Sequence, residues 1–271
     1  MTGWRRTIVP VAVVLVGVLA WWGLAIDAAR LGESLRAVGD LGRESWPPEG
    51  ERWFLSLVWD GLVETLQIAY LATLFGALLS LPLAMVAARN LAPAPLVVAA
   101  RTVASAIRVL PSLLWAILAV LVFGYGPLAG VVAMTLYTVG YLAKLQYEAF
   151  EGLHRDALDA VRAMGASRFQ QAWHVALPEA GNALRSQILF MLEYNVRAGT
   201  VVGIVGAGGI GQILMQYLTF GHYDKLLTIL VVMFVTVAVM DALSLLVRQR
   251  FLEMQDAPRA RWRDVARVGQ G

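Results

Sequence analysis

The sequence predicts an all-α membrane protein with about six transmembrane helices and a polar helical hairpin between two of them. Of its 271 residues, 59% are hydrophobic and 15% are charged, and the mean hydropathy is +0.65. A soluble domain of this length does not need so much apolar surface. Several apolar stretches are long enough to cross a bilayer core of roughly 30 Å at about 1.5 Å per residue.

Two segments precede the main group of spans. Residues 8–26 predict an uncleaved first span, because their apolar core exceeds the roughly 7 to 15 residues of a signal peptide. A cleaved signal peptide is the alternative, with residues 26–28 as a poor cleavage site. Further on, apolar side chains at helical spacing predict a short amphipathic helix on the membrane surface, ended by Pro47 and Pro48; they are Leu31, Leu35 and Val38.

Five more spans are predicted from the apolar runs that follow. They cover residues 62–88, 103–123, 128–145, 188–205 and 226–247. Pro111 makes the third span irregular, and residues 124–127 form a tight turn. The glycine-rich residues 203–211 lead into an amphipathic segment that ends near Tyr223. The chain is thus divided into a first helix with its amphipathic segment, 1–56, a transmembrane domain, 57–251, and a basic cytoplasmic tail, 252–271.

Residues 147–178, between the fourth and fifth spans, predict a helical hairpin. Its first helix carries an apolar stripe opposite a charged face, and Gly165 ends it because glycine adopts the left-handed C-cap conformation without a Cβ clash. The stripe comprises Leu153, Ala157, Ala160, Val161 and Met164, and the charged face comprises Arg155, Asp156, Asp159 and Arg162.

The second hairpin helix begins at Ser167, which forms a capping box with Gln170. Leu177-Pro178 is expected to stop this helix, because proline has no amide hydrogen. A hairpin with polar faces cannot lie in hydrocarbon, so we expect it to dock on a partner in water. A DNA-binding helix-turn-helix is the competing interpretation, but the acidic residues offset the arginines and leave no basic face for phosphates. The apolar side of the second helix comprises Phe169, Ala172, Trp173 and Ala176.

The distribution of basic residues predicts the orientation, because Lys and Arg are retained on the cytoplasmic side. With both termini inside, sixteen of the 22 Lys and Arg residues lie in the cytoplasm, five lie outside, and Arg197 lies in the membrane. The hairpin then faces the cytoplasm, where ATP is.

The sequence offers little for catalysis or cofactor binding. It has no cysteine, and its three histidines, His154, His174 and His222, lack metal-ligand spacing. No G-x-x-x-x-G-K-[ST] motif is present, so any ATP-driven work requires a separate ATPase. Residues 206–211 match G-x-G-x-x-G but lie between two spans on the outer side, where no βαβ unit is expected.

Polar residues inside the predicted spans are candidates for a substrate pathway, because ionisable groups at membrane depth are costly and usually functional. Glu193 and Arg197 stand four residues apart, and we favour a mutual structural pair over direct substrate contact. The glycine-rich stretch offers backbone amides to an oxyanion, with a bend or close helix packing as the alternative. Asp241 is assigned to helix packing. The pathway candidates are Glu64, Gln67, Glu193, Asn195, Arg197, Gly206, Gly208 and Gly209.

Taken in order, the motifs resemble the phosphonate-type permease subunits of bacterial ABC importers. Asp159-Ala160-Val161, Gly165 and Leu177-Pro178 resemble the loop that plugs into the ATPase in such permeases, with Asp159 and Val161 as mild departures from Glu and Ala. The resemblance extends over roughly residues 61–251 and includes several further segments, which makes it more specific than a single motif. These segments are 89–90, 108–112, 124–130, 193–197, 205–211 and 241–248.

The resemblance implies a type I ABC importer-like transmembrane domain, in which two copies of this chain form the pore in the bacterial inner membrane. Two cytoplasmic ATPase subunits, which bind ATP and Mg, would grip the two hairpins. A periplasmic binding protein would deliver a phosphonate, phosphite or hypophosphite. This chain would hold no cofactor, supply no catalytic residue and bind no nucleic acid. Phe169 and Trp173 would anchor the second hairpin helix, and the residues implied in coupling are Asp159, Ala160, Gly165, Ala166, Ser167, Phe169, Trp173, Leu177 and Pro178.

Other functions stay open from the sequence. Another small oxyanion or an amino acid is the alternative cargo. A membrane-tethered DNA-binding regulator would bind duplex DNA with a steep salt dependence. A membrane enzyme of lipid or phosphonate metabolism would need turnover by the isolated subunit.

Overall fold

The computed structural model describes the backbone of residues 3–23 and 28–268 and the side chains of residues 9–23, 30, 32–154 and 156–249. The chain divides into two compact units, Met1–Pro48 and Glu49–Gly271. The first unit contains α1 (Gly3–Gly23) and α2 (Ala28–Glu44), which confirms that the predicted amphipathic segment is helical. The described apolar part of α1 is Val9–Gly23, so the end of the predicted first span lies outside the described residues.

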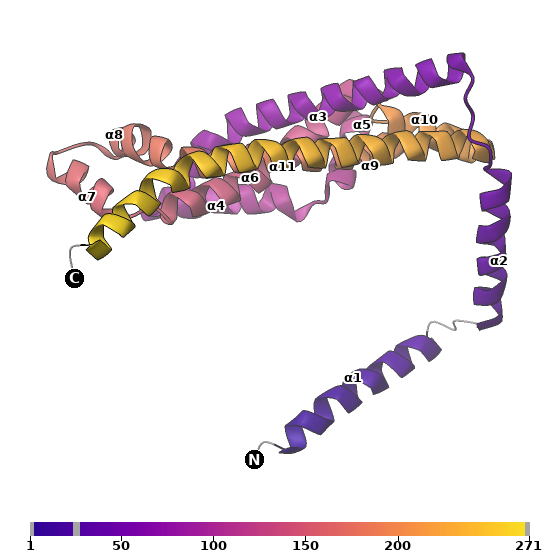
Figure 1. The fold of residues 1–271 in the computed structure, drawn as a ribbon, viewed down its shortest axis with the longest axis horizontal. Helices are drawn as coiled ribbons and strands as arrows, with labels where there is room; N and C mark the ends of the chain where they lie inside the picture. Colours follow the sequence, from indigo (N-terminus) through magenta and orange to yellow (C-terminus); the bar gives the residue numbers. More distant parts are fainter. Residues whose placement is uncertain (1–2, 24–27, 269–271) are drawn as a thin grey trace. The chain divides into compact units, whose positions relative to one another are not determined.

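The second unit is a bundle of long helices with a helical hairpin at one end (Figure 1). Helix α3 packs against α6 and α9, and α11 packs against α9 and α10. The elements in order are α3 (Arg52–Ala87), α4 (Ala94–Val109), α5 (Ser112–Phe123), α6 (Pro127–Glu151), α7 (Arg155–Ala163), α8 (Arg168–Gln171), the π-helical turn η1 (Ala172–Ala176), α9 (Leu177–Ile204), α10 (Ile210–Thr219) and α11 (Tyr223–Val268).

Several helices of this unit are long and apolar enough to cross a membrane. Among the described residues these are α3, α6 and the Tyr223–Gln249 part of α11, and α4 with α5 forms a fourth candidate that is bent by 85°. The bend lies at Pro111, where we expected an irregular span, because proline disfavours the α conformation of the preceding residue. Leu110 is accordingly extended, with φ −84° and ψ 127°.

Two helices extend beyond the spans predicted for them. Helix α3 begins at Arg52, ahead of the span predicted from residue 62, and α4 begins at Ala94, ahead of the span predicted from near residue 103. Helix α11 continues to Val268 through much of the predicted tail, whose arginine side chains lie outside the described residues.

Pro178 does not stop the second hairpin helix, contrary to the prediction. Helix α8 continues through η1 into α9, and the Leu177 N–H donates to the carbonyl five residues back, at Ala172. Pro178 then falls in the first turn of α9. Proline is tolerated there, because the missing N–H is one that the new helix does not need. The hairpin is therefore joined to α9 by continuous helix.

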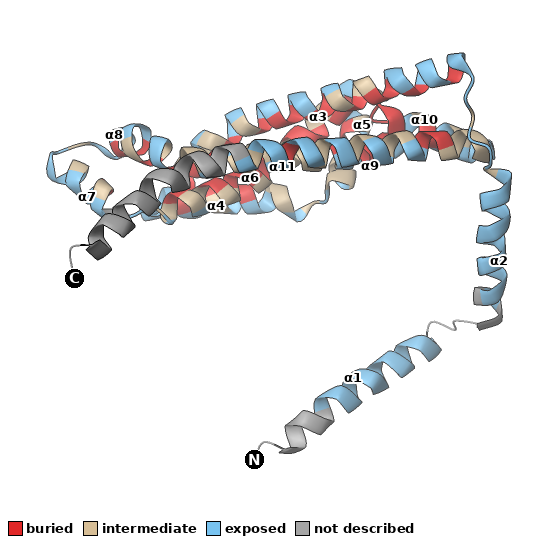
Figure 2. Ribbon diagram, in the orientation of Figure 1, coloured by how far each residue is buried: buried red, intermediate tan, exposed pale blue. Residues whose placement is uncertain are grey.

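The core of the second unit lies along the inner faces of α3, α6 and α9 (Figure 2). Small residues dominate it, as expected where helices approach closely in a membrane. One apolar cluster lies at the hairpin end and comprises Ala84, Ala88, Leu91, Phe150, Leu158, Ala172, Ala176, Ala180 and Leu184. The core therefore extends from the spans into the root of the hairpin.

Candidate functional site

The turn of the hairpin has the geometry that its sequence predicted. Gly165 has a φ of +87°, in the left-handed region that favours glycine. Its N–H donates to the Arg162 carbonyl (2.9 Å), and the Ala166 N–H donates to the Val161 carbonyl (3.3 Å). This pair of bonds is a Schellman motif, which satisfies the last carbonyls of α7.

The start of α8 also confirms the prediction. The Gln170 N–H donates to the Ser167 hydroxyl (3.3 Å), and the Gln170 side chain accepts from the Ser167 N–H (2.8 Å). Gln171, which the sequence did not single out, is buried and donates to the Ala166 carbonyl (2.8 Å). It also accepts from the Arg162 guanidinium (3.4 Å). The angle between α7 and α8 is thereby fixed by local hydrogen bonds on both sides of the turn.

The predicted aromatic anchors, Phe169 on α8 and Trp173 on η1, point out of the hairpin instead. Phe169 is 72% exposed and Trp173 is 51% exposed, and their rings stack with centroids 6.3 Å apart. The helix is held by the neighbouring alanines, Ala172 and Ala176, which pack in the cluster at the hairpin root. Phe169 and Trp173 are too bulky to fit where Ala172 and Ala176 pack. The two aromatic rings therefore remain on the surface as an apolar patch.

The predicted stripe on α7 is also only partly correct. Leu158, outside the stripe, is the buried residue of this helix, whereas Met164 is 78% exposed and Ala160 is exposed. Asp159 is exposed and lies 3.3 Å from the Arg162 guanidinium. Asp159 and Ala160 are thus exposed side by side on α7.

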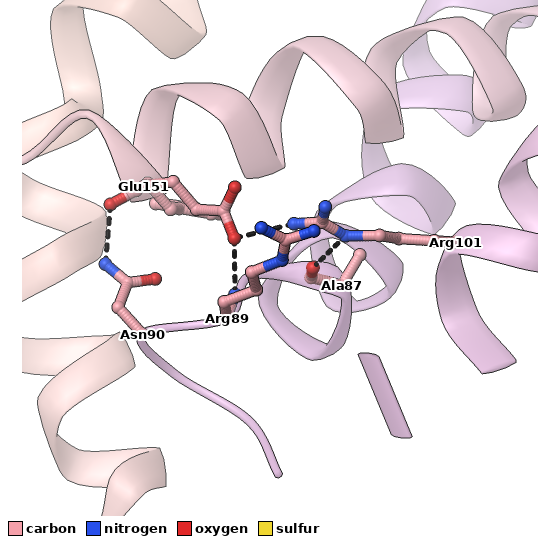
Figure 3. A network of polar contacts seen from close by, with 6 residues as sticks. Ala87, Arg89, Asn90, Arg101 and Glu151 are labelled. Atoms are coloured by element: carbon pink, nitrogen blue, oxygen red, sulfur yellow. Dashed lines mark hydrogen bonds and ion pairs between the residues drawn. The ribbon is translucent and has the colours of Figure 1, made fainter. Parts of the chain in front are cut away.

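A polar network on one carboxylate holds the root of the hairpin (Figure 3). An oxygen of Glu151, the last residue of α6, accepts from the Arg89 N–H (2.7 Å) and from the Arg101 guanidinium (2.6 Å). Arg101 also donates to the Ala87 carbonyl (2.9 Å), and Asn90 donates to a carbonyl in the last turn of α6 (2.7 Å). The network joins the end of α3, the middle of α4 and the end of α6 immediately before α7.

A cleft of about 840 Å³ opens beside this network. The walls come from the turn after α3, the end of α6 and the two short hairpin helices, and they carry both charge signs. The lining residues are Arg89, Asn90, Glu151, Leu153, Leu158, Asp159, Arg162 and Arg168. The hairpin therefore presents a polar cleft as well as the exposed aromatic pair.

Among the candidate pathway residues, Asn195 is part of a buried hydrogen-bond network. Its side-chain amide donates to the hydroxyls of Thr73 (2.9 Å) and Thr138 (3.0 Å). Asn195 is fully buried, so these bonds satisfy an amide that would otherwise be costly to bury. The network joins α9 to α3 and α6, and Thr73 and Thr138 were not predicted.

Glu193 and Arg197 do not pair with each other, contrary to the prediction. Glu193 forms an ion pair with Arg248 (2.6 Å) and accepts a hydrogen bond from Ser244, both on α11. Arg197 forms an ion pair with Asp241 (2.9 Å), also on α11. The Glu193 and Arg197 side chains point from α9 to different turns of α11. Each lies closer to an opposite charge on α11 than to the other side chain four residues away on α9. The helix-packing assignment of Asp241 agrees with this contact.

The glycine-rich stretch is tightly packed. Gly206, Gly208 and Gly209 are buried with φ between +75° and +89°. A Cβ on Gly208 would lie 2.8 Å from a Glu64 carboxylate oxygen and 3.0 Å from Pro127, and one on Gly209 would clash with Thr65. The Thr65 hydroxyl accepts from the Ile210 N–H (2.9 Å). This geometry fits close packing, and oxyanion contact stays a prediction.

The candidate pathway residues are distributed over separate environments rather than gathered in one pocket. Glu64 lies at the glycine loop, Asn195 lies in the core, and Glu193 and Arg197 face α11. Gln67 is exposed on α3. In the part of the chain with described side chains, no group of three or more histidine or acidic residues could hold a metal ion.

Comparisons with known proteins agree with one another. The family model described as "Binding-protein-dependent transport system inner membrane component" matches residues 80–253. The chain is 37% identical over 254 residues to the phosphite transport system permease protein PtxC of Stutzerimonas stutzeri, covering 92% of this chain and 91% of PtxC. It is 35% identical over 190 residues to the phosphate-import permease protein PhnE of Mycolicibacterium smegmatis, covering 70% of this chain and 36% of PhnE.

The solved structures give the same result for the fold. An inward-facing structure of the MetNI methionine ABC transporter matches with a TM-score of 0.66 and 26% sequence identity, covering 74% of this chain and 99% of the MetNI chain. The bundle therefore has the fold of a type I ABC importer transmembrane domain.

A double-mutant cycle tests the charge pairing between α9 and α11. We expect Glu193→Gln and Arg248→Gln to show a coupling energy of about 1 kcal/mol or more in unfolding from detergent, because these charges are in direct contact. The matched cycle of Glu193→Gln with Arg197→Gln should give a value near zero. A coupling energy between Glu193 and Arg197 that exceeds the one between Glu193 and Arg248 would support the pair predicted from the sequence and contradict the structure.

Proposed function

The chain belongs to the family of binding-protein-dependent transport system inner membrane components, the permease subunits of ABC importers, and we propose that it carries a phosphorus oxyanion across the inner membrane. The cargo class is a phosphonate or a related reduced-phosphorus anion, phosphite or hypophosphite. Similarity to a phosphite permease over nearly the full length of both chains supports this cargo. Another small oxyanion or an amino acid is the alternative, and a relative named for phosphate import and a methionine transporter are among the similar proteins.

The geometry of the hairpin is the observation that supports the proposed mechanism. Its turn is fixed by Gly165 and the Ser167 capping box, and its continuous helical connection to α9 can transmit a push into a span. In the proposed mechanism, two copies of this chain form the pore, and two separate ATPase subunits bind ATP and Mg. ATP-driven closure of the ATPases moves the hairpins and tilts the spans between outward-open and inward-open states.

The exposed side chains of the hairpin supply the docking surface. Phe169 and Trp173 present stacked rings that bury little area within this chain, and large aromatic side chains are typical interface anchors. The polar cleft beside them, with Asp159 and Arg162, supplies groups for hydrogen bonds around that anchor. We therefore propose that the ATPase subunit covers the aromatic pair and the Asp159 face. The chain itself carries no ATP site in this proposal.

The orientation and the remaining partner belong to the same proposal. The excess of Lys and Arg predicted on the hairpin side supports a cytoplasmic hairpin and cytoplasmic termini. A binding protein in the periplasm delivers the anion to the opposite end of the bundle, and selectivity resides mainly in that protein.

The cargo is tested by ATP hydrolysis of the complete complex in lipid. The binding protein is preloaded in turn with methylphosphonate, aminoethylphosphonate, phosphite, hypophosphite, phosphate and sulfate. We expect a reduced-phosphorus ligand to stimulate hydrolysis most, because the loaded binding protein favours the state in which the ATPases close. Stimulation by none of the phosphorus ligands, from a complex shown to be intact, would contradict the proposed cargo.

The hairpin is tested by Gly165→Trp with Gly165→Asn as its control. A tryptophan in the left-handed conformation costs about 1–2 kcal/mol, whereas asparagine tolerates that conformation. We expect Gly165→Trp to reach the membrane but to lose ATPase subunits on purification or to hydrolyse ATP without transport. Gly165→Asn should retain the ATPase subunits on purification and couple ATP hydrolysis to transport. Normal ATPase retention and normal transport by Gly165→Trp would rule out the coupling role.

A further inference from the structure

Three tyrosines from two helices form a stack inside the bundle. Tyr137 and Tyr141 stand one turn apart on α6, with ring centroids 5.9 Å apart. Tyr194 of α9 lies against both, 5.2 Å from the Tyr137 ring and 6.4 Å from the Tyr141 ring, with interplanar angles of 16° and 10°. All three are only partly buried. The stack therefore joins α6 to α9 through partly exposed aromatic rings.

Two cations lie at the edge of this stack. Arg108 and Lys144 line one cavity of about 220 Å³ together with Tyr141 and Leu145. This volume is several times the roughly 30 Å³ that one water molecule occupies in the liquid, so a small oxyanion fits with part of its hydration shell. Tyr141 thus belongs both to the aromatic stack and to the basic cavity.

Arg108 is free to act on a ligand. Among the described residues, no carboxylate forms an ion pair with it, in contrast to Arg101 and Arg197. Lys144 has only a partly exposed i, i+4 partner, Glu148, at 3.6 Å, and such pairs contribute little. The cavity therefore carries a net positive charge that the chain itself does not neutralise.

The fold holds Arg108 in this position. It lies in the last turn of α4, just before the break at Pro111, and the Trp115 indole N–H of α5 donates to the Ile107 carbonyl (3.0 Å). On α6, a Cβ at Gly140 would come within 3.2 Å of the Arg108 backbone nitrogen. Glycine at this position allows α4 to approach α6 closely. The break and the close approach together bring the arginine beside Tyr141.

The cluster lies along α6 from near its middle toward its hairpin end. Helix α6 begins at Pro127, so at about 1.5 Å per residue Tyr137 lies about 15 Å along it and Lys144 about 26 Å, out of about 37 Å in total. The two cations therefore lie toward the hairpin end of the bundle, and two cations that face one small cavity favour an anionic ligand. Packing between α6 and α9 is already supplied by the Asn195 network, so the tyrosine hydroxyls and the two cations are not needed for it.

We infer that Arg108, Lys144 and the Tyr141 hydroxyl form a binding station for the transported phosphorus oxyanion, with Tyr137 and Tyr194 packed against the Tyr141 ring. Arg108 offers a planar fork of donors that matches two oxygens of such an anion, Lys144 adds a point charge, and the Tyr141 phenol donates a hydrogen bond. The inference rests on the proposed function and deepens it. The single small cavity and the neutral phenol favour weak binding, which lets the anion leave again.

The absence of cysteine from the chain allows a test that needs no transport. Leu145→Cys places one thiol in the cavity, and its labelling by an anionic and by a cationic methanethiosulfonate reagent is followed on this subunit in the complete complex. We expect Arg108→Gln to lower the ratio of anionic to cationic labelling rates several-fold, and phosphite to slow labelling. Arg52→Gln, an exposed basic residue at the start of α3, is the matched control. If Arg108→Gln leaves the ratio of anionic to cationic labelling rates unchanged, or if phosphite does not slow labelling, the proposed binding station is wrong.

Transport by the complete complex supplies the second test. Arg108→Gln and Tyr141→Phe should lower uptake of the anion several-fold while ATP hydrolysis stimulated by the binding protein persists. Arg108→Lys should restore only part of the uptake, because lysine keeps the charge but not the planar fork of donors. Tyr70→Phe, at an exposed position of α3, is the control for the tyrosine. Wild-type uptake in both Arg108→Gln and Tyr141→Phe would overturn the station but leave the proposed function standing. A wild-type complex that carries no phosphorus oxyanion would overturn both.

Discussion

The carboxylate of Glu151 is the contact on which the coupling of hairpin and spans depends. It lies at the last residue of α6, and it binds the backbone after α3 and the guanidinium of α4 at the same time. Arg101, itself stacked 4.3 Å from the Tyr147 ring, completes the bond to the end of α3. A carboxylate with charge-assisted bonds on two sides resists separation of the three helices more than a neutral contact would. A force on α7 and α8 therefore reaches α3, α4 and α6 together.

Beyond this root, small residues and the buried Asn195 amide connect the helices along the bundle. The cluster around Phe150 and Ala176 continues the hairpin into α9 without a break in the helix. Asn195 then ties α9 to α3 and α6, and the two ion pairs tie α9 to α11. Because these contacts are close and specific, the spans are expected to move as packed units rather than to bend individually. The aromatic stack lies between α6 and α9, the helices that bracket the hairpin, and the basic cavity lies between α4 and α6.

The sequence predicted what depends on neighbours along the chain and missed what depends on distant ones. The helix end at Gly165 and the capping box at Ser167 were predicted correctly, because each motif is complete within six residues. The predicted stop at Pro178 was wrong, since the π turn Ala172–Ala176 leads directly into α9 and Pro178 falls in the first turn of that helix. The partners of Glu193 and Arg197 lie on α11, more than forty residues away, and no local spacing indicates them. Thr73, Thr138 and Tyr141 look like ordinary span residues until the helices are packed.

The most direct measurement of the central claim is the number of ATP molecules hydrolysed per anion carried by a complex with Glu151→Gln. The neutral amide keeps the shape of the side chain but weakens both charge-assisted bonds at the hairpin root. Glu179→Gln, an exposed carboxylate in the first turn of α9, is the matched control. If force enters the spans through the Glu151 network, Glu151→Gln hydrolyses ATP with several-fold less transport per ATP, and Glu179→Gln matches the wild type. Equal transport per ATP in both variants would contradict this role of the network.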